Sequence, residues 1–117
     1  MKWLSVALAS LGLAISALAA EQPAARWISA GGALSEWIVE LGGADRLVAV
    51  DTTSRHLPQL QGLLVIGYQR QLAAEGILAL APDVLLGTEE MGPLPVLEQL
   101  RNAGVAVEVM PATAQLD

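Results

Sequence analysis

Apolar residues along the chain follow two spacings, one typical of buried strands and one typical of helices. Short apolar runs with no alternation suit strands that are covered on both faces. In residues 33–43, apolar residues at i, i+3, i+4 and i+7 predict a helix with one inward face, made of Leu34, Trp37, Ile38 and Leu41. The expected strands are 26–30, 46–50, 63–67, 84–87 and 105–109, and the expected helices are 33–43, 72–80 and 95–104.

Glycine and proline mark the ends of the expected helices. Gly42 and Gly43 end the first helix, Pro82 ends the second, and Gly104 ends the third. Strands that alternate with helices of about ten residues predict βαβ units and a parallel sheet. The pattern therefore predicts one α/β lobe with a Rossmann-like, three-layer architecture.

The first residues have a different pattern, that of a secretory signal peptide. Lys2 is followed by an apolar stretch and then by the small-x-small triplet Ala17-Leu18-Ala19. The apolar stretch is too short for a membrane-spanning helix, which needs about 20 residues. We expect cleavage of residues 1–19, export to the periplasm, no stable membrane anchor, and a mature lobe formed by residues 20–117.

Charge and composition exclude one class of function. The chain of 117 residues has a formal net charge of −6, and no basic stripe offsets it. Such a surface repels nucleic acid, so nucleic-acid binding is excluded. The chain has no cysteine, which is compatible with an oxidising compartment.

Two loops have weak signs of chemistry. Gly31 and Gly32 follow a strand and open a helix, but they lack the GxGxxG spacing of a dinucleotide site, so a tight turn is the favoured role. His56, the only histidine, follows Asp51 and Ser54 in a loop, and nearness in sequence does not make a catalytic triad. One histidine cannot form a zinc site by itself, so His56 as a ligand or as a solvated side chain stays open.

Tyr68 is the only tyrosine and stands at the end of an apolar run, where open α/β sheets bind ligands. Phenolate is a known axial ligand of haem iron. Arg70 is two residues further on, and a nearby guanidinium favours the charged phenolate. These residues alone leave open a tyrosine that only packs or forms a hydrogen bond.

A longer comparison with known motifs narrows this choice. "SAGGALSEWIVELGGADRLVAVDTTS", "IGYQRQLAAEGILALAPDVLLGTEEMGP" and "VLEQLRNAGV" follow one another between residue 26 and about residue 110. In this order they resemble the N-terminal lobe of periplasmic haem-binding proteins of bacterial haem ABC transporters, which belong to the class III periplasmic binding proteins. The Glu-Gly and Pro-Asp portions are shared with cobalamin and siderophore carriers, whereas Gly67-Tyr68-Gln69-Arg70 is specific to haem.

The resemblance implies a role for individual residues. Tyr68 would be the ligand of ferric haem iron, and Arg70 would support it. The Asp-Thr-Thr-Ser loop would contribute to the pocket through Thr52, Thr53, Ser54 and His56, although Arg55-His56-Leu57-Pro58 departs from the usual aromatic and proline. Three acids are candidates for docking to a permease or are ordinary solvated charges, namely Glu89, Glu90 and Glu98.

The resemblance also implies a function without catalysis. The protein would bind ferric haem as transported ligand, receive it from an outer-membrane receptor, and deliver it to an inner-membrane permease with its ATPase. Alternatives are a siderophore or cobalamin carrier, a small exported enzyme on a Rossmann-like lobe, and a remnant that binds nothing. The family has two lobes that clamp haem, and this sequence ends at Asp117, so we expect a truncated form whose second lobe is absent and whose haem binding is weak.

Overall fold

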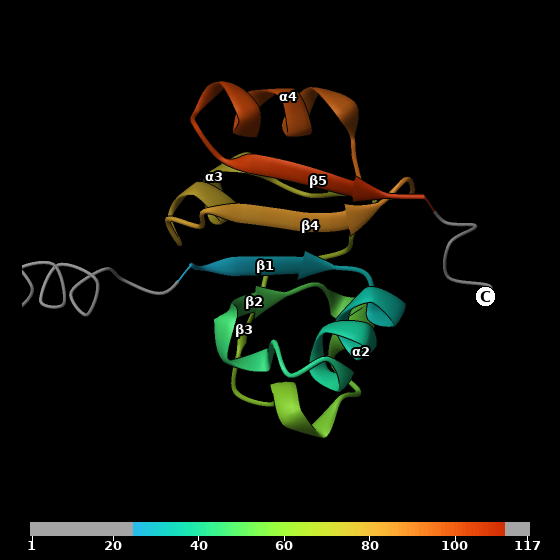
Figure 1. Ribbon diagram of the computed structural model, residues 1–117. Coiled ribbons are helices and arrows are strands. Elements are labelled where there is room, and N and C mark those ends of the chain that lie inside the picture. The colour runs from blue at the N-terminus through green and yellow to red at the C-terminus, as the bar shows by residue number, and fades with distance from the viewer. Residues whose placement is uncertain (1–24, 112–117) are drawn as a thin grey trace, which may run out of the picture.

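The computed structural model describes residues 25–111, which form a five-stranded parallel sheet with helices on both faces (Figure 1). Every neighbouring strand pair is parallel, which confirms the predicted α/β class. In the sheet the strands lie in the order β3-β2-β1-β4-β5. Their bounds are β1 Trp27–Ala30, β2 Leu47–Val50, β3 Leu64–Val65, β4 Val84–Thr88 and β5 Ala106–Met110. The expected signal peptide, residues 1–19, lies outside the described residues.

Helices and short turns connect the strands. The α-helices are α2 Gly32–Glu40, α3 Ala74–Leu78 and α4 Leu94–Asn102, and the 3-10 turns are η1 Ala44–Arg46, η2 Thr52–Ser54 and η3 Pro58–Leu60. The first crossovers carry the chain from β1 outward to β2 and β3, and the later ones place β4 on the other side of β1. The strand order therefore reverses between β1 and β4, and this switch point is where open α/β sheets form their binding crevice.

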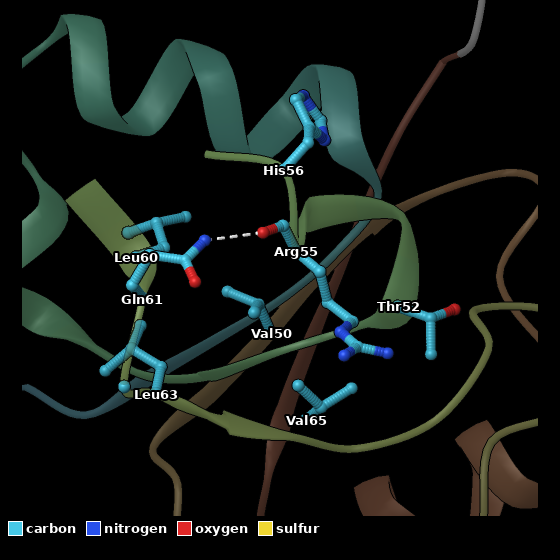
Figure 2. Close-up of a pocket in the computed structure, with 9 residues that line it drawn as sticks. Val50, Thr52, Arg55, His56, Leu60, Gln61, Leu63 and Val65 are labelled. Atoms are coloured by element: carbon cyan, nitrogen blue, oxygen red, sulfur yellow. Dashed lines mark hydrogen bonds between the residues drawn. The ribbon is translucent and has the colours of Figure 1, made fainter. Parts of the chain in front are cut away.

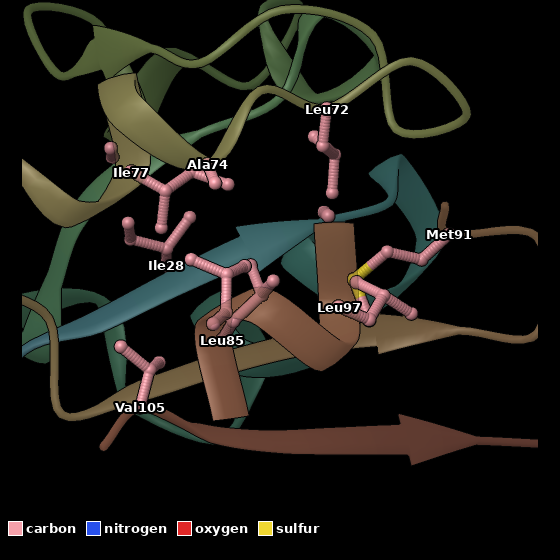
Figure 3. Packing of buried hydrophobic residues seen from close by; sticks show 11 residues of the cluster. Ile28, Leu72, Ala74, Ile77, Leu85, Met91, Leu97 and Val105 are labelled. Atoms are coloured by element: carbon pink, nitrogen blue, oxygen red, sulfur yellow. The ribbon is translucent and has the colours of Figure 1, made fainter. Parts of the chain in front are cut away.

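Two apolar clusters show that the sheet is covered on both faces. One cluster joins the buried side chains of α3 and α4 to Ile28 and Leu85 of the central strands (Figure 3). The other joins Leu34 and Ile38 of α2 to Leu47, Val50 and Leu60. The predicted three-layer arrangement is confirmed.

The predicted inward face of the first helix is partly wrong. Leu34 and Ile38 are buried, but Trp37 is 52% exposed and Leu41 is 78% exposed. The helix ends at Glu40, so Leu41 lies beyond its last turn, and the buried face is turned toward Ser35 instead. In α4, Leu97 and Leu100 are buried as predicted, and Val96 is half-buried.

Two elements are shorter than the apolar pattern predicts. The strand expected at 63–67 is only Leu64–Val65, and the helix expected at 72–80 is only Ala74–Leu78. The residues between β3 and α3 run across the ends of other strands. Their backbone groups therefore form hydrogen bonds with loops instead of extending either element. In residues 25–111, no helix is long and apolar enough to cross a membrane.

The two leucines allow a matched test of this core. Leu100 is fully buried between α4 and the sheet, whereas Leu41 projects from the helix end. Leu100→Ala should lower the free energy of unfolding by about 2–5 kcal/mol, because it removes apolar contacts and leaves a cavity. Leu41→Ala should change it by less than about 0.5 kcal/mol. Urea denaturation followed by circular dichroism measures both, and equal losses would contradict the placement of these residues.

Candidate functional site

Residues 67–72, here called the crossing segment, run across the carboxyl edge of the sheet and carry Tyr68 and Arg70. At one end, the Thr52 N–H donates to the Gly67 carbonyl at 2.9 Å, beside β2. At the other end, the Gly92 N–H donates to the Gln69 carbonyl and the Leu72 N–H donates to the Gly92 carbonyl, both at 2.9 Å. The segment is thus attached to the loop after β2 and to the loop after β4.

Gln69 belongs to this segment, and its side chain lies at the switch point. Its side chain is buried, and its Nε2 donates to Glu90 Oε2 at 3.2 Å. A Cβ added to Gly31, in the loop after β1, would lie 3.3 Å from Gln69 Oε1. The crevice between the β1 and β4 loops is therefore filled by the protein's own amide side chain.

The packing of the glycine pair supports the tight-turn role. Gly31 has a φ of 149°, a conformation that favours glycine. A Cβ on Gly32 would lie 2.6 Å from the Thr53 carbonyl oxygen, so a side chain there would clash with the backbone of the neighbouring loop. Close packing of two loops thus accounts for both glycines.

Tyr68 is presented to solvent rather than to the core. Its side chain is 41% exposed, and no hydrogen bond engages its hydroxyl among residues 25–111. This removes the core-filling role that the sequence left open. A phenol oxygen at the carboxyl edge of a parallel sheet is positioned to meet a ligand from outside.

Arg70, two residues after Tyr68, forms an ion pair with Glu90 of the loop after β4. Arg70 Nη2 lies 3.4 Å from Glu90 Oε1, and both side chains are about half exposed. Because Glu90 also accepts from Gln69, its two oxygens bind successive residues of the crossing segment. The Arg70 cation is therefore shared with a carboxylate of the protein itself.

Asp51 organises the Asp-Thr-Thr-Ser loop from a fully buried position. Its Oδ1 accepts from the Gly31 N–H and the Ser54 hydroxyl, both at 2.9 Å. Its Oδ2 accepts from the Thr53 hydroxyl at 2.7 Å and the Thr53 N–H at 3.3 Å. The carboxylate therefore joins the loop after β1 to the loop after β2.

The predicted pocket residues of this loop have different positions. The hydroxyls of Thr53 and Ser54 bind Asp51, and Ser54 also contacts Ser35 of α2 at 2.6 Å. His56 Nε2 lies 3.1 Å from Glu36 Oε1, next to α2. Of the four predicted residues, Thr52 and His56 line a cavity, and the other two are structural.

This cavity has a volume of about 640 Å³ and lies between the η2 turn and the β3 edge (Figure 2). Figure 2 shows the Arg55 side chain extending between Thr52 and Val65, whereas His56 lies on the other side of the turn. The remaining lining consists of Val50, Leu60, Gln61, Gly62, Leu63 and Val65.

The structure also locates the candidate docking acids. Glu89 and Glu90 follow β4 in the edge loop, and Glu98 lies on α4; all three are exposed. Among residues 25–111, no three acidic, histidine or cysteine side chains cluster as a metal site.

Sequence reasoning missed three contributors to this site. Asp51 has a readable signal, because an aspartate after a strand followed by threonine and serine is typical of a side chain that accepts from the next turn. Gln69 and Arg55 have no such signal, since their positions depend on loops that are distant in the sequence.

Comparisons with known proteins agree with this geometry. The family model described as periplasmic binding protein matches residues 28–116. No match was found among curated proteins.

Three solved structures illustrate the similarity. A periplasmic haem-binding protein from Pseudomonas aeruginosa is 67% identical, with a TM-score of 0.72 over 74% of this chain and 31% of that one. HutB of Vibrio cholerae, a periplasmic haem-binding protein, is 49% identical, with a TM-score of 0.69 over 74% and 33% of the two chains. The vitamin B12-binding protein BtuF of Vibrio cholerae is 31% identical, with a TM-score of 0.65 over 74% and 34%.

The chain thus spans about a third of the length of the solved structures it matches. The match to the family model covers most of the chain, and the five-stranded parallel sheet agrees with it. The chain belongs to the periplasmic binding protein family.

Proposed function

We propose that this chain supplies the tyrosine side of the ferric haem site in the substrate-binding component of a haem ABC uptake transporter. The observation that carries the proposal is the exposed phenol of Tyr68, fixed at the carboxyl edge with Arg70 two residues away. Relatives at 67% and 49% identity are haem-binding proteins, whereas the cobalamin-binding relative is 31% identical. Haem is therefore favoured over cobalamin as the ligand.

Ligation through Tyr68 follows from the chemistry of the two partners. Ferric iron is a hard cation, and phenolate is an anionic oxygen donor used as an axial haem ligand. Arg70, two residues further on, would place a cation beside the iron-bound phenolate. The protein binds and releases its ligand, so no bond is made or broken apart from iron coordination, and an enzymatic activity is not proposed.

Glu90 would weaken the electrostatic support that Arg70 gives to the iron-bound phenolate. An ion pair between half-exposed side chains is weak, typically below about 1 kcal/mol. Arg70 can therefore leave Glu90 when an anionic phenolate forms nearby. Glu90 competes with the phenolate for the same cation, while its contact with Gln69 keeps it beside the crossing segment.

The proposal extends to location and partners. The signal-peptide pattern of residues 1–19 indicates export to the periplasm. There the protein would accept haem from an outer-membrane receptor and pass it to an inner-membrane permease and its ATPase. Glu89 and Glu98 remain candidates for permease docking, and Glu90 also has the contact with Arg70 described above.

The first prediction concerns the phenol oxygen. Tyr68→Phe should remove the visible band of ferric tyrosinate and weaken haemin binding by at least about tenfold, because only the ligand atom is lost. The free energy of unfolding should change by about 1 kcal/mol or less, since the hydroxyl has no partner in the described structure. Haemin titration followed by visible absorbance measures both the band and the affinity.

Cyanocobalamin serves as the control ligand in this titration. It should not bind either protein in the same concentration range. An unchanged tyrosinate band in the phenylalanine variant, or tighter binding of cyanocobalamin than of haemin, would contradict the proposed function.

A second prediction concerns the charges around Tyr68. Arg70→Ala should weaken haemin binding by about tenfold, because the cation proposed to balance the iron-bound phenolate is lost. Glu90→Gln should strengthen haemin binding slightly, because Arg70 is then no longer shared with a carboxylate. The glutamine retains an oxygen that can accept from Gln69.

Glu89→Gln is the matched control, because it removes the same charge one residue away. Haemin titration at low ionic strength gives the affinities of all four proteins. Equal changes in affinity for the Glu89 and Glu90 variants would show that only the total charge matters and that the Arg70–Glu90 pair has no specific role.

A further inference from the structure

Residues 68–71 form a β-turn that begins at Tyr68 and contains one buried side chain. The Gln71 N–H donates to the Tyr68 carbonyl at 2.9 Å and closes the turn. The side chains of Tyr68, Arg70 and Gln71 are exposed, whereas that of Gln69 is buried. Among the side chains of the turn, that of Gln69 therefore joins it to the interior of the lobe.

The amide of Gln69 lies between loops that follow two different strands. On the β4 side, its Nε2 donates to Glu90 Oε2 at 3.2 Å. On the β1 side, a Cβ added to Gly31 would lie 3.3 Å from its Oε1, so the glycine leaves the room that the amide fills. Moving the amide while it stays buried would leave a polar group without its partner, so the side chain is held in one position.

The backbone of Gln69 is attached to the β4 loop as well. The Gly92 N–H donates to the Gln69 carbonyl, and the Leu72 N–H donates to the Gly92 carbonyl, both at 2.9 Å. Main chain and side chain of one residue thus contact the same loop at two points. One point would let the turn pivot, whereas two points define its orientation.

The orientation of the turn decides where the Tyr68 phenol points. In the described structure no hydrogen bond engages the phenol hydroxyl, and 41% of the side chain is exposed. Its direction therefore depends on the backbone of the turn that it begins. A ligand atom that is already held in place loses less conformational freedom on binding, which raises the affinity.

We propose that Gln69 is a positioning residue for Tyr68: its buried amide holds the turn in the orientation that presents the phenol oxygen to the iron of the ligand. This inference rests on the proposed function and adds to it a residue that acts without touching the ligand. Groups that orient a metal ligand typically contribute about 10- to 100-fold to affinity.

The test compares Gln69→Met with Gln71→Met in the full chain. Methionine is unbranched and of similar length, so at position 69 it can fill the crevice but cannot donate to Glu90. Gln71 has an exposed side chain in the same turn, and its variant keeps the N–H that closes the turn, so it is the matched control. Urea denaturation establishes that each variant is folded.

A second pair of variants removes the same hydrogen bond from the exposed partner, which keeps the test decisive if Gln69→Met does not fold. Glu90→Ala takes away the acceptor of the Gln69 amide, whereas Glu90→Gln retains an oxygen that can accept from it. Both variants remove the same charge, so a difference between them reports on the hydrogen bond.

The first measurement needs no ligand. Tyr68 is the only tyrosine of the chain, so labelling with ¹⁵N-tyrosine gives a single backbone signal in the NMR spectrum. Its order parameter should be about 0.85 in the wild type, Gln71→Met and Glu90→Gln, and should fall toward about 0.6 in Gln69→Met and Glu90→Ala. Equal order parameters in all of these proteins would overturn the role of Gln69.

The second measurement asks whether Gln69 acts through the phenol. Gln69→Met should weaken haemin binding by about tenfold in the wild-type background and cause no further loss in the Tyr68→Phe background, because the oxygen that it positions is then absent. Gln71→Met should leave the affinity unchanged in both backgrounds. An equal loss in the two backgrounds would show that Gln69 supports the fold in general and would overturn the inference.

The two measurements separate this inference from the proposed function. A wild-type protein without a tyrosinate band in haemin would refute iron ligation by Tyr68, while an order parameter that depends on Gln69 would still support its hold on the turn. A tyrosinate band together with an order parameter and affinity that do not depend on Gln69 would refute the positioning role and leave the proposed function intact.

Discussion

The buried carboxylate of Asp51 is the interaction on which the carboxyl edge of the sheet depends. Parallel strands end at one edge, where backbone donors leave the sheet and need new acceptors. Asp51 accepts from the backbone of Gly31 and Thr53 and from the hydroxyls of Thr53 and Ser54, so one side chain satisfies donors from two loops. A buried carboxylate is costly unless such bonds are complete, which ties both loops to a single geometry.

The fixed loops in turn determine where a ligand can bind. Gln69 fills the crevice between the β1 and β4 loops, which is where doubly wound folds commonly hold nucleotides. The crossing segment closes over this crevice and places Tyr68 on its outer surface. The available surface is thus a broad edge with one exposed phenol, and such a surface suits a large flat ligand better than a small molecule enclosed in a cleft.

Local patterns in the sequence predicted the elements that local physics determines. Buried strands such as β4 and the long helix α4 follow from apolar runs and helical spacing, and the parallel sheet follows from their alternation. The same reasoning failed where tertiary contacts prevail. Trp37 and Leu41 have helical spacing yet are exposed, because α2 ends at Glu40 and rotates Ser35 inward.

The candidate site was predictable only in part, for the same reason. Tyr68 and Arg70 could be selected from their chemistry and from a motif of four consecutive residues. The pairing of Arg70 with Glu90 spans twenty sequence positions and depends on how the crossing segment meets the β4 loop. The direction of Arg55 depends on a turn held by Asp51 and Gln61, which no spacing rule describes.

Charge is not evenly neutralised along the carboxyl edge of this acidic chain. The net charge of −6 acts over the whole surface, but salt limits the reach of exposed charges to about 8 Å at physiological ionic strength. Within that range of the carboxyl edge, the cations Arg55 and Arg70 have different surroundings: Arg70 is paired with Glu90, whereas Arg55 has no acidic partner in the described structure. An anion that reaches this edge would therefore meet a less neutralised cation at Arg55 than at Arg70.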